Sequence, residues 1–282
     1  GSVGLLASLI YAVFSSGPLI QGSLANCEAF MMLPVVAATY MFYLGYKDQN
    51  RQYLFLSGMV TGVAYLIKEA ALPNLFLLLI FLPMTCERST KVIYVKQLFK
   101  KYLLLLLGFA LPLIAHYAYL YLNNALFDYL IGVYNWNRGY GTYSFDIFWR
   151  RLIDRGVYSL GREYSFIWIA SLIAVSVMII TDKTIENLYV ILWILFSFVG
   201  VCLGSMFWPH YFVQMIPSLS IAAAYGLTKL YMGSKNPRPL IKTVTLVSAA
   251  ILSISMGYGI KTDYKFYITY TPEEISRNIY GS

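Results

Sequence analysis

The chain has 282 residues, of which 59% are hydrophobic and 12% charged, and its net charge at pH 7 is +8. A soluble domain carries about twice that share of charged residues. The apolar residues here stand in long runs, for example 102–122 and 187–204. About 20 apolar residues in a helix span the hydrocarbon core of a bilayer. The composition therefore excludes a soluble domain and predicts an all-α, polytopic membrane protein.

The net positive charge of the chain is explained by the basic loops of a membrane protein. Basic residues collect in the cytoplasmic loops of membrane proteins, and no surface with interleaved aromatic and basic residues predicts nucleic-acid binding. The three cysteines, Cys27, Cys86 and Cys202, fall in different loops and spans. Their spacing predicts neither a disulfide framework nor a metal cluster, so no metal is assigned from the cysteines.

Nine apolar segments follow one another along the chain, and we predict about nine membrane segments from them. The chain begins inside the first of these, without an initiator Met, and is expected to be a fragment of a longer protein. The predicted segments are Val3–Phe14, Ala29–Tyr46, Tyr53–Ile67, Ala70–Met84, Tyr102–Leu122, Tyr164–Ile180, Asn187–Gly204, Tyr211–Tyr231 and Thr243–Ile260.

Lysine and arginine in the loops set the expected orientation. Alternate loops carry most of these residues and are placed in the cytoplasm. The opposite face receives Ser15–Cys27, the long loop 123–163, the turn Ser205–His210 and the tail after Ile260. We expect a transmembrane domain over 1–260 in the cell membrane, and over 261–282 the start of a truncated extracytoplasmic region. The cytoplasmic set is Lys47, Arg51, Arg88, Lys91, Lys96, Lys100, Lys101, Lys183, Lys229, Lys235, Arg238 and Lys242.

Two charges, Lys68 and Glu69, interrupt an otherwise apolar stretch, "GVAYLIKEAALPNLFLLLIF". A charge in hydrocarbon costs at least roughly 2.5–3.5 kcal/mol. The flanking segments are too short to span separately, and a single long span would reverse the loop charge bias. We therefore predict a hairpin of two short helices, with Pro73 in the first turn of the second. Its tip is either a polar site or a snorkelling lysine with Glu69 as its counter-charge.

Further polar residues are predicted on the extracytoplasmic face. Asn26 and Glu28 open a helix, either as a cap and a favourable first-turn acid or as the lining of a polar cavity. In the long loop, "YNWNR" combines aromatic rings, amides and a guanidinium, groups that suit a sugar and a phosphate as well as an interfacial aromatic belt. His210 opens another helix beside Trp208. The candidates in this loop are Tyr134, Asn137 and Arg138.

The long loop also contains a helix signal. Apolar residues recur at helical spacing from Ile147 to Leu160, with arginines between them. The pattern predicts an amphipathic helix lying at the outer membrane surface. Near the end of the chain, Thr271, Pro272 and Glu274 are typical of a helix that starts with a capping box.

Four stretches resemble the polytopic membrane glycosyltransferases of the C superfamily, of the dolichyl-phosphate-mannose protein mannosyltransferase-like and aminoarabinose transferase-like group. They are "LIQGSLANCEAFMMLPVVAATYMFYLGY", "YLFLSGMVTGVAYLIKEAALPNLFLLLIF", "PHYFVQMIPSLSIAAAYG" and "YTPEEISRNIYGS". In the second stretch, Gly58, Gly62, Ala64 and Lys68 match a family helix that ends in a lysine at the active-site cavity.

Two further positions carry this resemblance. Asn26 and Glu28 match an Asn followed by an acid on an outer loop, and His210 with Pro217 matches a His or Arg before "Y-F-x-x-x-x-P". The resemblance implies a substrate-binding set of Asn26, Glu28, Lys68, Glu69, Tyr134, Asn137, Arg138 and His210.

The resemblance implies an enzyme that moves a sugar from a polyprenyl-phosphate donor to a protein, lipid or glycan acceptor on the outer face. Lys68, Arg138 and His210 are candidates for binding the donor phosphate, and Glu28 for orienting the acceptor or, less favoured, for holding a divalent cation. In the family, the general base is an aspartate on a first outer loop, which this chain lacks. The chain is therefore expected to be inactive alone. The alternative is a transporter or flippase, which also uses half-helices with charged residues.

Overall fold

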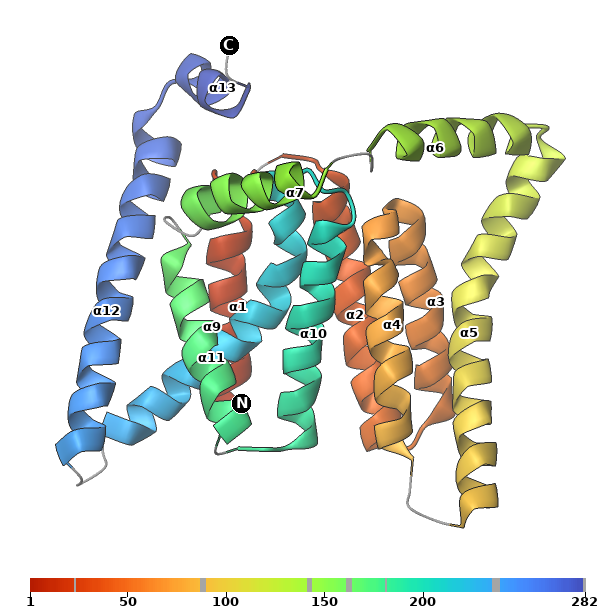
Figure 1. Ribbon diagram of the computed structural model, residues 1–282, viewed down its shortest axis with the longest axis horizontal. Helices are drawn as coiled ribbons and strands as arrows, with labels where there is room; N and C mark the ends of the chain where they lie inside the picture. The colour runs from red at the N-terminus through yellow and green to blue at the C-terminus, as the bar shows by residue number, and fades with distance from the viewer. Residues whose placement is uncertain are drawn as a thin grey trace. The chain divides into compact units, whose positions relative to one another are not determined.

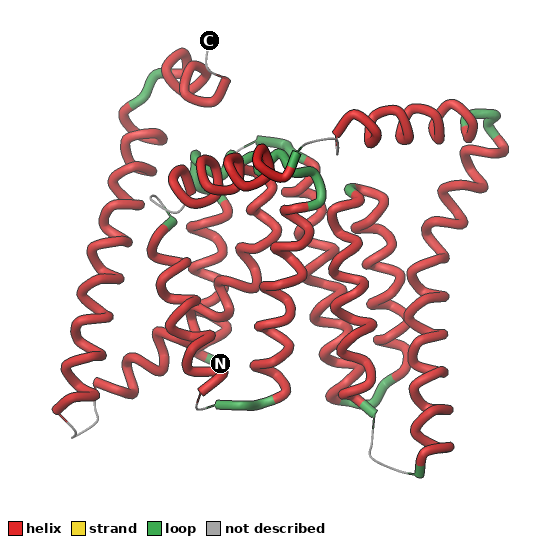
Figure 2. The backbone as a smooth tube through the Cα atoms, viewed as in Figure 1, coloured by secondary structure: helices red, strands yellow, loops and turns green. Residues whose placement is uncertain are grey.

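The computed structural model describes residues 1–22, 24–86, 90–140, 144–160, 164–180, 182–234 and 239–280. Every regular element within these ranges is a helix (Figure 2), which confirms the all-α prediction. The chain divides into two compact units. Unit 1 contains Gly1–Ala25, Trp149–Ile194 and Phe207–Ser282, and unit 2 contains Asn26–Phe148 and Leu195–Met206.

Each of the nine predicted apolar segments overlaps helical structure, although Ala70–Met84 and Tyr211–Tyr231 each combine 3-10 and α-helical elements. Three helices of the described chain are long and apolar enough to cross a membrane: Cys27–Lys47, Val92–Leu122 and Ile185–Cys202. Shorter apolar helices cover Ser2–Ser15, Glu69–Thr85 and Ser165–Ile180. The integral membrane character is therefore supported, while nine separate spans remain a prediction.

Unit 2 begins with α2 (Cys27–Lys47) and α3 (Arg51–Ile67), followed by the 3-10 turn η1 (Glu69–Ala71) and α4 (Leu72–Phe81). A second 3-10 turn, η2 (Leu82–Thr85), leads to the long helix α5 (Lys91–Leu122). After α5 come α6 (Leu126–Tyr140) and the start of α7 (Phe145–Arg151), as Figure 1 shows.

Helix α3 packs against both α2 and α5. Its α2 side is tied by Ser57, whose Oγ donates to the carbonyl oxygen of Ala38 at 2.8 Å. On the side of α3 that faces α5, two glycines allow a close approach. A Cβ atom added at Gly58 would lie 2.0 Å from the carbonyl oxygen of Leu105, and one added at Gly62 would lie 2.5 Å from the carbonyl oxygen of Phe109. Small residues let helix backbones approach this closely in membranes. The glycines of the family-like motif therefore set the α3–α5 packing.

The structure corrects the predicted start of the α5 segment. The basic stretch before Tyr102 was predicted to be a loop, but α5 already begins at Lys91. Lysine is a good helix former, and Lys101 is also buried: its Nζ donates to the Thr85 carbonyl oxygen at 2.8 Å. Farther along, Leu107, Leu111 and Ile114 are exposed on α5, which is the pattern of a surface that contacts lipid.

Unit 1 is built around α11 (Ile216–Ser234), which packs against α1 (Ser2–Ser15) and α9 (Ser165–Ile180). A row of small buried residues on α11, Ala222 to Ala224, permits this packing. Ser171 Oγ of α9 donates to the Leu219 carbonyl oxygen at 3.0 Å. The first part of α10 (Ile185–Cys202) also belongs to this unit.

The remaining elements of unit 1 are shorter or terminal. A π-helix, η3 (Leu152–Leu160), continues from α7, and the 3-10 helix η4 (Pro209–Met215) precedes α11. Helix α12 (Pro239–Tyr264), the π-helix η5 (Lys265–Thr269) and α13 (Pro272–Tyr280) end the chain. The predicted capping box is confirmed: Thr271 N donates to Glu274 Oε2 at 2.8 Å, and Glu274 N to Thr271 Oγ1 at 3.3 Å.

The predicted amphipathic helix is helical throughout, but its second part is the wider π-helix η3. Two contacts hold η3 against η4: Gly156 lies against the Phe212 ring, and the Arg155 guanidinium stacks 3.9 Å from the Trp208 ring centre. Burial lowers the pKa of Arg155 from its usual value. Location of this helix at the outer leaflet remains a prediction.

The α9–α10 connection carries an ion pair with a pH-dependent consequence. Lys229 Nζ lies 2.5 Å from Asp182 Oδ2, and Tyr225 donates a hydrogen bond to the same oxygen. The bond from Lys229, then that from Tyr225, lowers the pKa of Asp182. A lowered carboxyl pKa contributes stability above the unfolded-state value of about 3.9, which is lost as pH falls through the folded-state pKa.

We therefore expect Asp182→Asn to lower the thermal unfolding temperature slightly at neutral pH, because the ion pair is exposed to solvent. The difference from the wild type should shrink as pH falls below about 4, the unfolded-state pKa, and should disappear only below the lowered folded-state pKa of Asp182. Unfolding of the detergent-solubilised protein, followed by circular dichroism across this pH range, checks the expectation. A difference of the same size at all pH values would contradict it.

Candidate functional site

The break between α3 and α4 places Lys68 at a turn. Lys68 N still donates to Ala64 O at 3.1 Å, closing α3, but the residue itself is extended, with φ −157° and ψ 132°. Its carbonyl oxygen then accepts from Ala71 N at 3.0 Å, starting η1. Pro73 lies in the first turn of α4, where its missing N–H costs little. The predicted hairpin with Lys68 at its tip is confirmed.

Lys68 is paired with an acid 40 residues away. Its Nζ donates to Glu28 Oε1, forming an ion pair between the hairpin tip and the first turn of α2. The Glu28 side chain is only 2% exposed, whereas that of Lys68 is 29% exposed. The structure thus joins two predicted site residues that the sequence analysis had placed in the same site without pairing them.

The burial of Glu28 makes this pair important for folding as well as for chemistry. Removing one partner of a buried ion pair typically costs 3–5 kcal/mol, because the remaining charge is left without compensation. Lysine carries three donors, and part of the Lys68 side chain stays exposed. A lysine held in place by a buried carboxylate is a more specific feature of a binding site than a lysine that only snorkels to the membrane interface.

Asn26 occupies the expected N-cap position of α2, with φ −77° and ψ 150°, but its side chain makes no capping hydrogen bond. Its Nδ2 is buried and has no hydrogen-bond partner among the described residues. A buried donor without a partner costs roughly 1–3 kcal/mol. The prediction is therefore confirmed for position and wrong for the capping bond, and the free amide supports the polar-site interpretation.

The Glu69 side chain is exposed, and its charge acts on Tyr65 and Tyr129. The pKa of Tyr129 in α6 is raised mainly by burial, and further by Tyr117 and the charge of Glu69. The rings of His116, Tyr117 and Tyr129 form a cluster with centre-to-centre distances of 5.3, 5.6 and 6.2 Å. The sequence analysis missed this cluster because no local spacing links α5 with the long loop.

Three candidates, Tyr134, Asn137 and Arg138, lie in the backbone of α6. Their segment was predicted to be a loop, and the structure corrects this to a helix. Their side chains lie outside the described residues, so their proposed contacts with a sugar or phosphate remain predictions.

His210 belongs to unit 1, in η4. Its Nδ1 lies 2.6 Å from Oε1 of Gln21, and its ring meets that of Tyr211 edge-on at 5.0 Å. Four residues on, Gln214 is 1% exposed, and neither amide atom has a hydrogen-bond partner among the described residues. Native proteins rarely leave such groups without a hydrogen bond. The Gln214 amide in η4 is therefore able to form hydrogen bonds with a ligand. Gln21 and Gln214 were not predicted as site residues.

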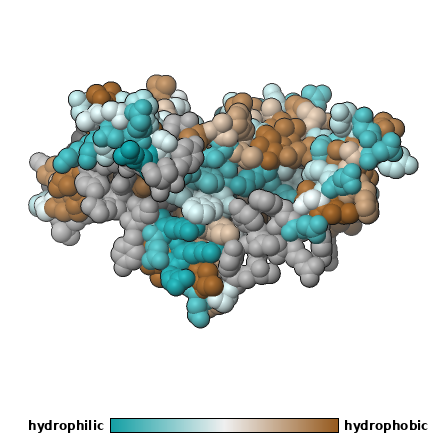
Figure 3. Space-filling model, turned by 90° about the horizontal axis from the view of Figure 1, so that it is seen from above, coloured by the Kyte–Doolittle hydropathy of each residue, from teal (hydrophilic) through white to brown (hydrophobic). Residues whose placement is uncertain are grey.

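Figure 3 shows clusters of hydrophilic side chains separated by hydrophobic ones on the face seen from above. Within the described ranges, no group of three or more His, Cys, Asp or Glu could hold a metal ion. In unit 2, Lys68 is held by Glu28 and stays partly exposed, so that an anion can approach its ammonium group.

One family match agrees with this chemistry. Residues 1–119 match the family model described as dolichyl-phosphate-mannose-protein mannosyltransferase. The matched part contains Asn26, Glu28, Lys68 and Glu69 and ends within α5. The match covers less than half of the chain, and over that part the chain is similar to this family. No curated protein and no solved structure matches the chain.

Proposed function

We propose that the protein transfers a sugar from a polyprenyl-phosphate donor to a protein, lipid or glycan acceptor on the extracytoplasmic face of the cell membrane. The family match supports a membrane mannosyltransferase-like glycosyltransferase. The observation that carries the finer proposal is Lys68, held by the buried carboxylate of Glu28 at the tip of the hairpin.

Lys68 would act on the leaving group. An acceptor oxygen attacks the anomeric carbon, the bond from that carbon to the phosphate oxygen breaks, and the electron pair leaves with the lipid phosphate. The phosphate then gains negative charge, which a fixed ammonium stabilises. Glu28 positions that ammonium and neutralises it when the site is empty. The acceptor proton goes to a general base, which the family places on a first outer loop.

The other predicted residues complete the proposed site. Asn26, with its free amide, is assigned to the sugar or acceptor, and Glu69 to the entrance beside the His116–Tyr117–Tyr129 cluster. Aromatic rings can stack on a sugar, and a carboxylate can accept hydrogen bonds from its hydroxyl groups. Tyr134, Asn137 and Arg138 are assigned to the donor sugar and phosphate, and His210, which belongs to unit 1, stays a separate candidate for binding phosphate.

A transporter or flippase of lipid-linked sugars is the second candidate. The break between α3 and α4 at Lys68 favours this second candidate, because transporters also use interrupted helices. The family match favours the enzyme. The two candidates differ in product: an enzyme releases free polyprenyl phosphate, whereas a flippase leaves the sugar on its carrier.

Deletion of the gene tests the proposal directly. Mass spectrometry of membrane lipids should then show a polyprenyl-phosphate sugar accumulating, together with loss of that sugar from a protein, lipid or glycan. Complementation with the complete protein should reverse both changes, and complementation with a Lys68→Met variant should not. An unchanged lipid-linked sugar pool and an unchanged set of glycans would contradict the proposal.

The native cysteines provide a test of the proposed orientation. Cys27 lies at the start of α2 and is exposed. Cys86 directly follows η2, the turn that comes after the C-terminal end of α4. In intact cells, a membrane-impermeant maleimide should label a variant that retains only Cys27. A variant that retains only Cys86 should require permeabilised cells, which also serve as the control for reactivity. The opposite labelling pattern would show that the proposed orientation is wrong.

A further inference from the structure

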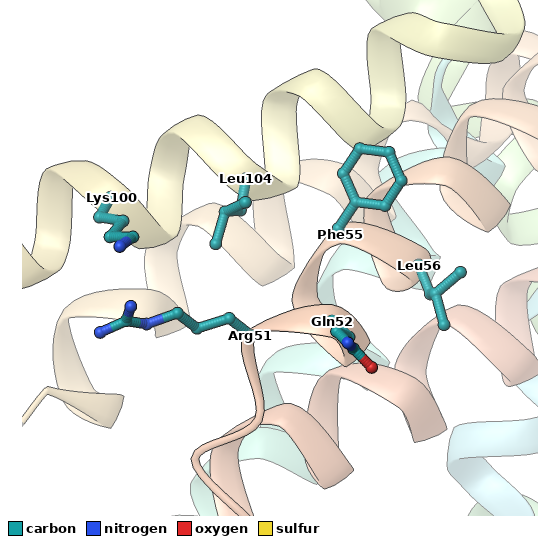
Figure 4. A pocket seen from close by; sticks show the side chains of 6 residues that line it. All are labelled: Arg51, Gln52, Phe55, Leu56, Lys100 and Leu104. Carbon is teal, nitrogen blue, oxygen red and sulfur yellow. The ribbon is translucent and has the colours of Figure 1, made fainter.

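A recess of about 490 Å³ lies between α3 and α5, within unit 2. Figure 4 shows that four lining side chains come from α3 and two from α5. One end of the recess is cationic, and the rest of its wall is largely apolar. The lining residues are Arg51, Gln52, Phe55, Leu56, Lys100 and Leu104.

Arg51 and Lys100 bring two positive charges to the same end of the recess (Figure 4). Both side chains are exposed, and neither forms an ion pair with any residue that the structure describes. Two like charges that face one recess repel each other. Arg51 is also the first residue of α3, where the helix dipole favours negative charge. An anion in this end of the recess would therefore stabilise the local structure.

The neighbouring residue, Lys101, differs from the exposed Lys100 in its burial and contacts. Lys101 is buried, and its Nζ donates to both the carbonyl oxygen and Oγ1 of Thr85. Lys100 makes no such bond within the described ranges. Adjacent lysines on α5 therefore differ: one fastens α5 to η2, and the other faces the recess.

The apolar part of the recess limits the kind of anion. Phe55, Leu56 and Leu104 provide hydrocarbon surface next to the two cations. A small soluble anion gains nothing from such a wall, whereas a lipid places its phosphate on the cations and its chain on the wall. A phosphate monoester carries about −1.5 to −2 charges at neutral pH, which matches two cations better than a phosphodiester does.

We propose that this recess binds the headgroup of an anionic membrane lipid with a terminal phosphate monoester. Arg51 takes two phosphate oxygens through its planar fork, Lys100 takes the third, and the lipid chain lies against Phe55 and Leu104. The site is separate from the one around Lys68, because the two lie at opposite ends of α3, about 24 Å apart along the helix.

Native mass spectrometry of the complete protein, with phosphatidic acid as the probe, tests the proposal. The wild type should bind phosphatidic acid in preference to phosphatidylglycerol and phosphatidylcholine. Arg51→Gln and Lys100→Gln should each weaken phosphatidic acid binding by about tenfold or more, since a charge-assisted bond is lost. Arg51→Lys, which keeps the charge without the fork, should give an intermediate loss.

The matched control is Lys96→Gln, one turn before Lys100 on α5 and exposed, but outside the recess. It should leave binding unchanged, and all variants should elute as the wild type does in size-exclusion chromatography. An equal loss in Lys96→Gln would indicate diffuse attraction to a basic segment and overturn the proposal. So would equal binding of all three lipids, unaltered binding in both recess variants, or inorganic phosphate that binds as tightly as phosphatidic acid.

Discussion

Lys68→Met is expected to reduce sugar transfer by roughly ten- to over a hundredfold, because a charge-assisted bond to phosphate is worth about 1.5–3 kcal/mol. The structure adds a second effect. Glu28 is nearly fully buried beside Lys68, so the variant leaves a buried carboxylate without its partner and should also lose stability, by up to about 3–5 kcal/mol. Transfer assays and thermal unfolding of the same preparation measure the two effects.

A second variant separates the effect on chemistry from the effect on folding. Replacing both partners of a buried ion pair by apolar residues is often neutral for stability. Lys68→Met combined with Glu28→Met should therefore regain most of the lost stability while remaining inactive. Lys68→Arg should keep the ion pair and part of the activity. Normal transfer by the stable double variant would reduce Lys68 to a structural residue.

Gly58→Val should cause the largest loss of stability that does not involve a charge. A Cβ at Gly58 would lie 2.0 Å from the Leu105 carbonyl oxygen and 3.0 Å from Phe109 N, both backbone atoms of α5. Backbone cannot give way as a flexible side chain can, so α3 and α5 must separate. Overpacking costs typically 1–3 kcal/mol and occasionally more, and we expect at least this loss in thermal unfolding.

Gly132→Val is the matched control for this prediction. Gly132 lies in α6, and nothing lies within 4 Å of a Cβ built there. The same substitution should therefore leave the unfolding temperature nearly unchanged, since valine has a better helix propensity than glycine. Equal destabilisation by both substitutions would mean that close α3–α5 contact is not the cause.

The apolar runs and the turn chemistry of the chain predict much of this fold. Segment length and the loop charge bias correctly indicated the hairpin, in which Pro73 fits the first turn of α4, and Thr271 and Glu274 correctly indicated the cap of α13. The turn and the cap are local features, involving residues only a few positions apart. The start of α5 was predicted less well, because the basic residues before Tyr102 suggested a loop, although lysine is compatible with a helix.

The candidate site could be predicted only as separate residues. Glu28 and Lys68 were each selected from their apolar surroundings, but their pairing depends on how α2 packs against α3, which no sequence spacing records. The same limit applies to the ring cluster of His116, Tyr117 and Tyr129, which joins α5 to α6. Gln214 gave no signal, because its burial comes from the tertiary packing of η4.

The most direct test of the proposed chemistry is the release of polyprenyl phosphate. The complete protein, reconstituted in liposomes with a polyprenyl-phosphate-linked mannose and an acceptor extract, is expected to release the free carrier phosphate as sugar appears on the acceptor. The stable variant with Lys68→Met and Glu28→Met should release almost none. If the wild type leaves the sugar on its carrier, or if this variant releases carrier phosphate at the wild-type rate, the assignment of Lys68 to the leaving phosphate is contradicted.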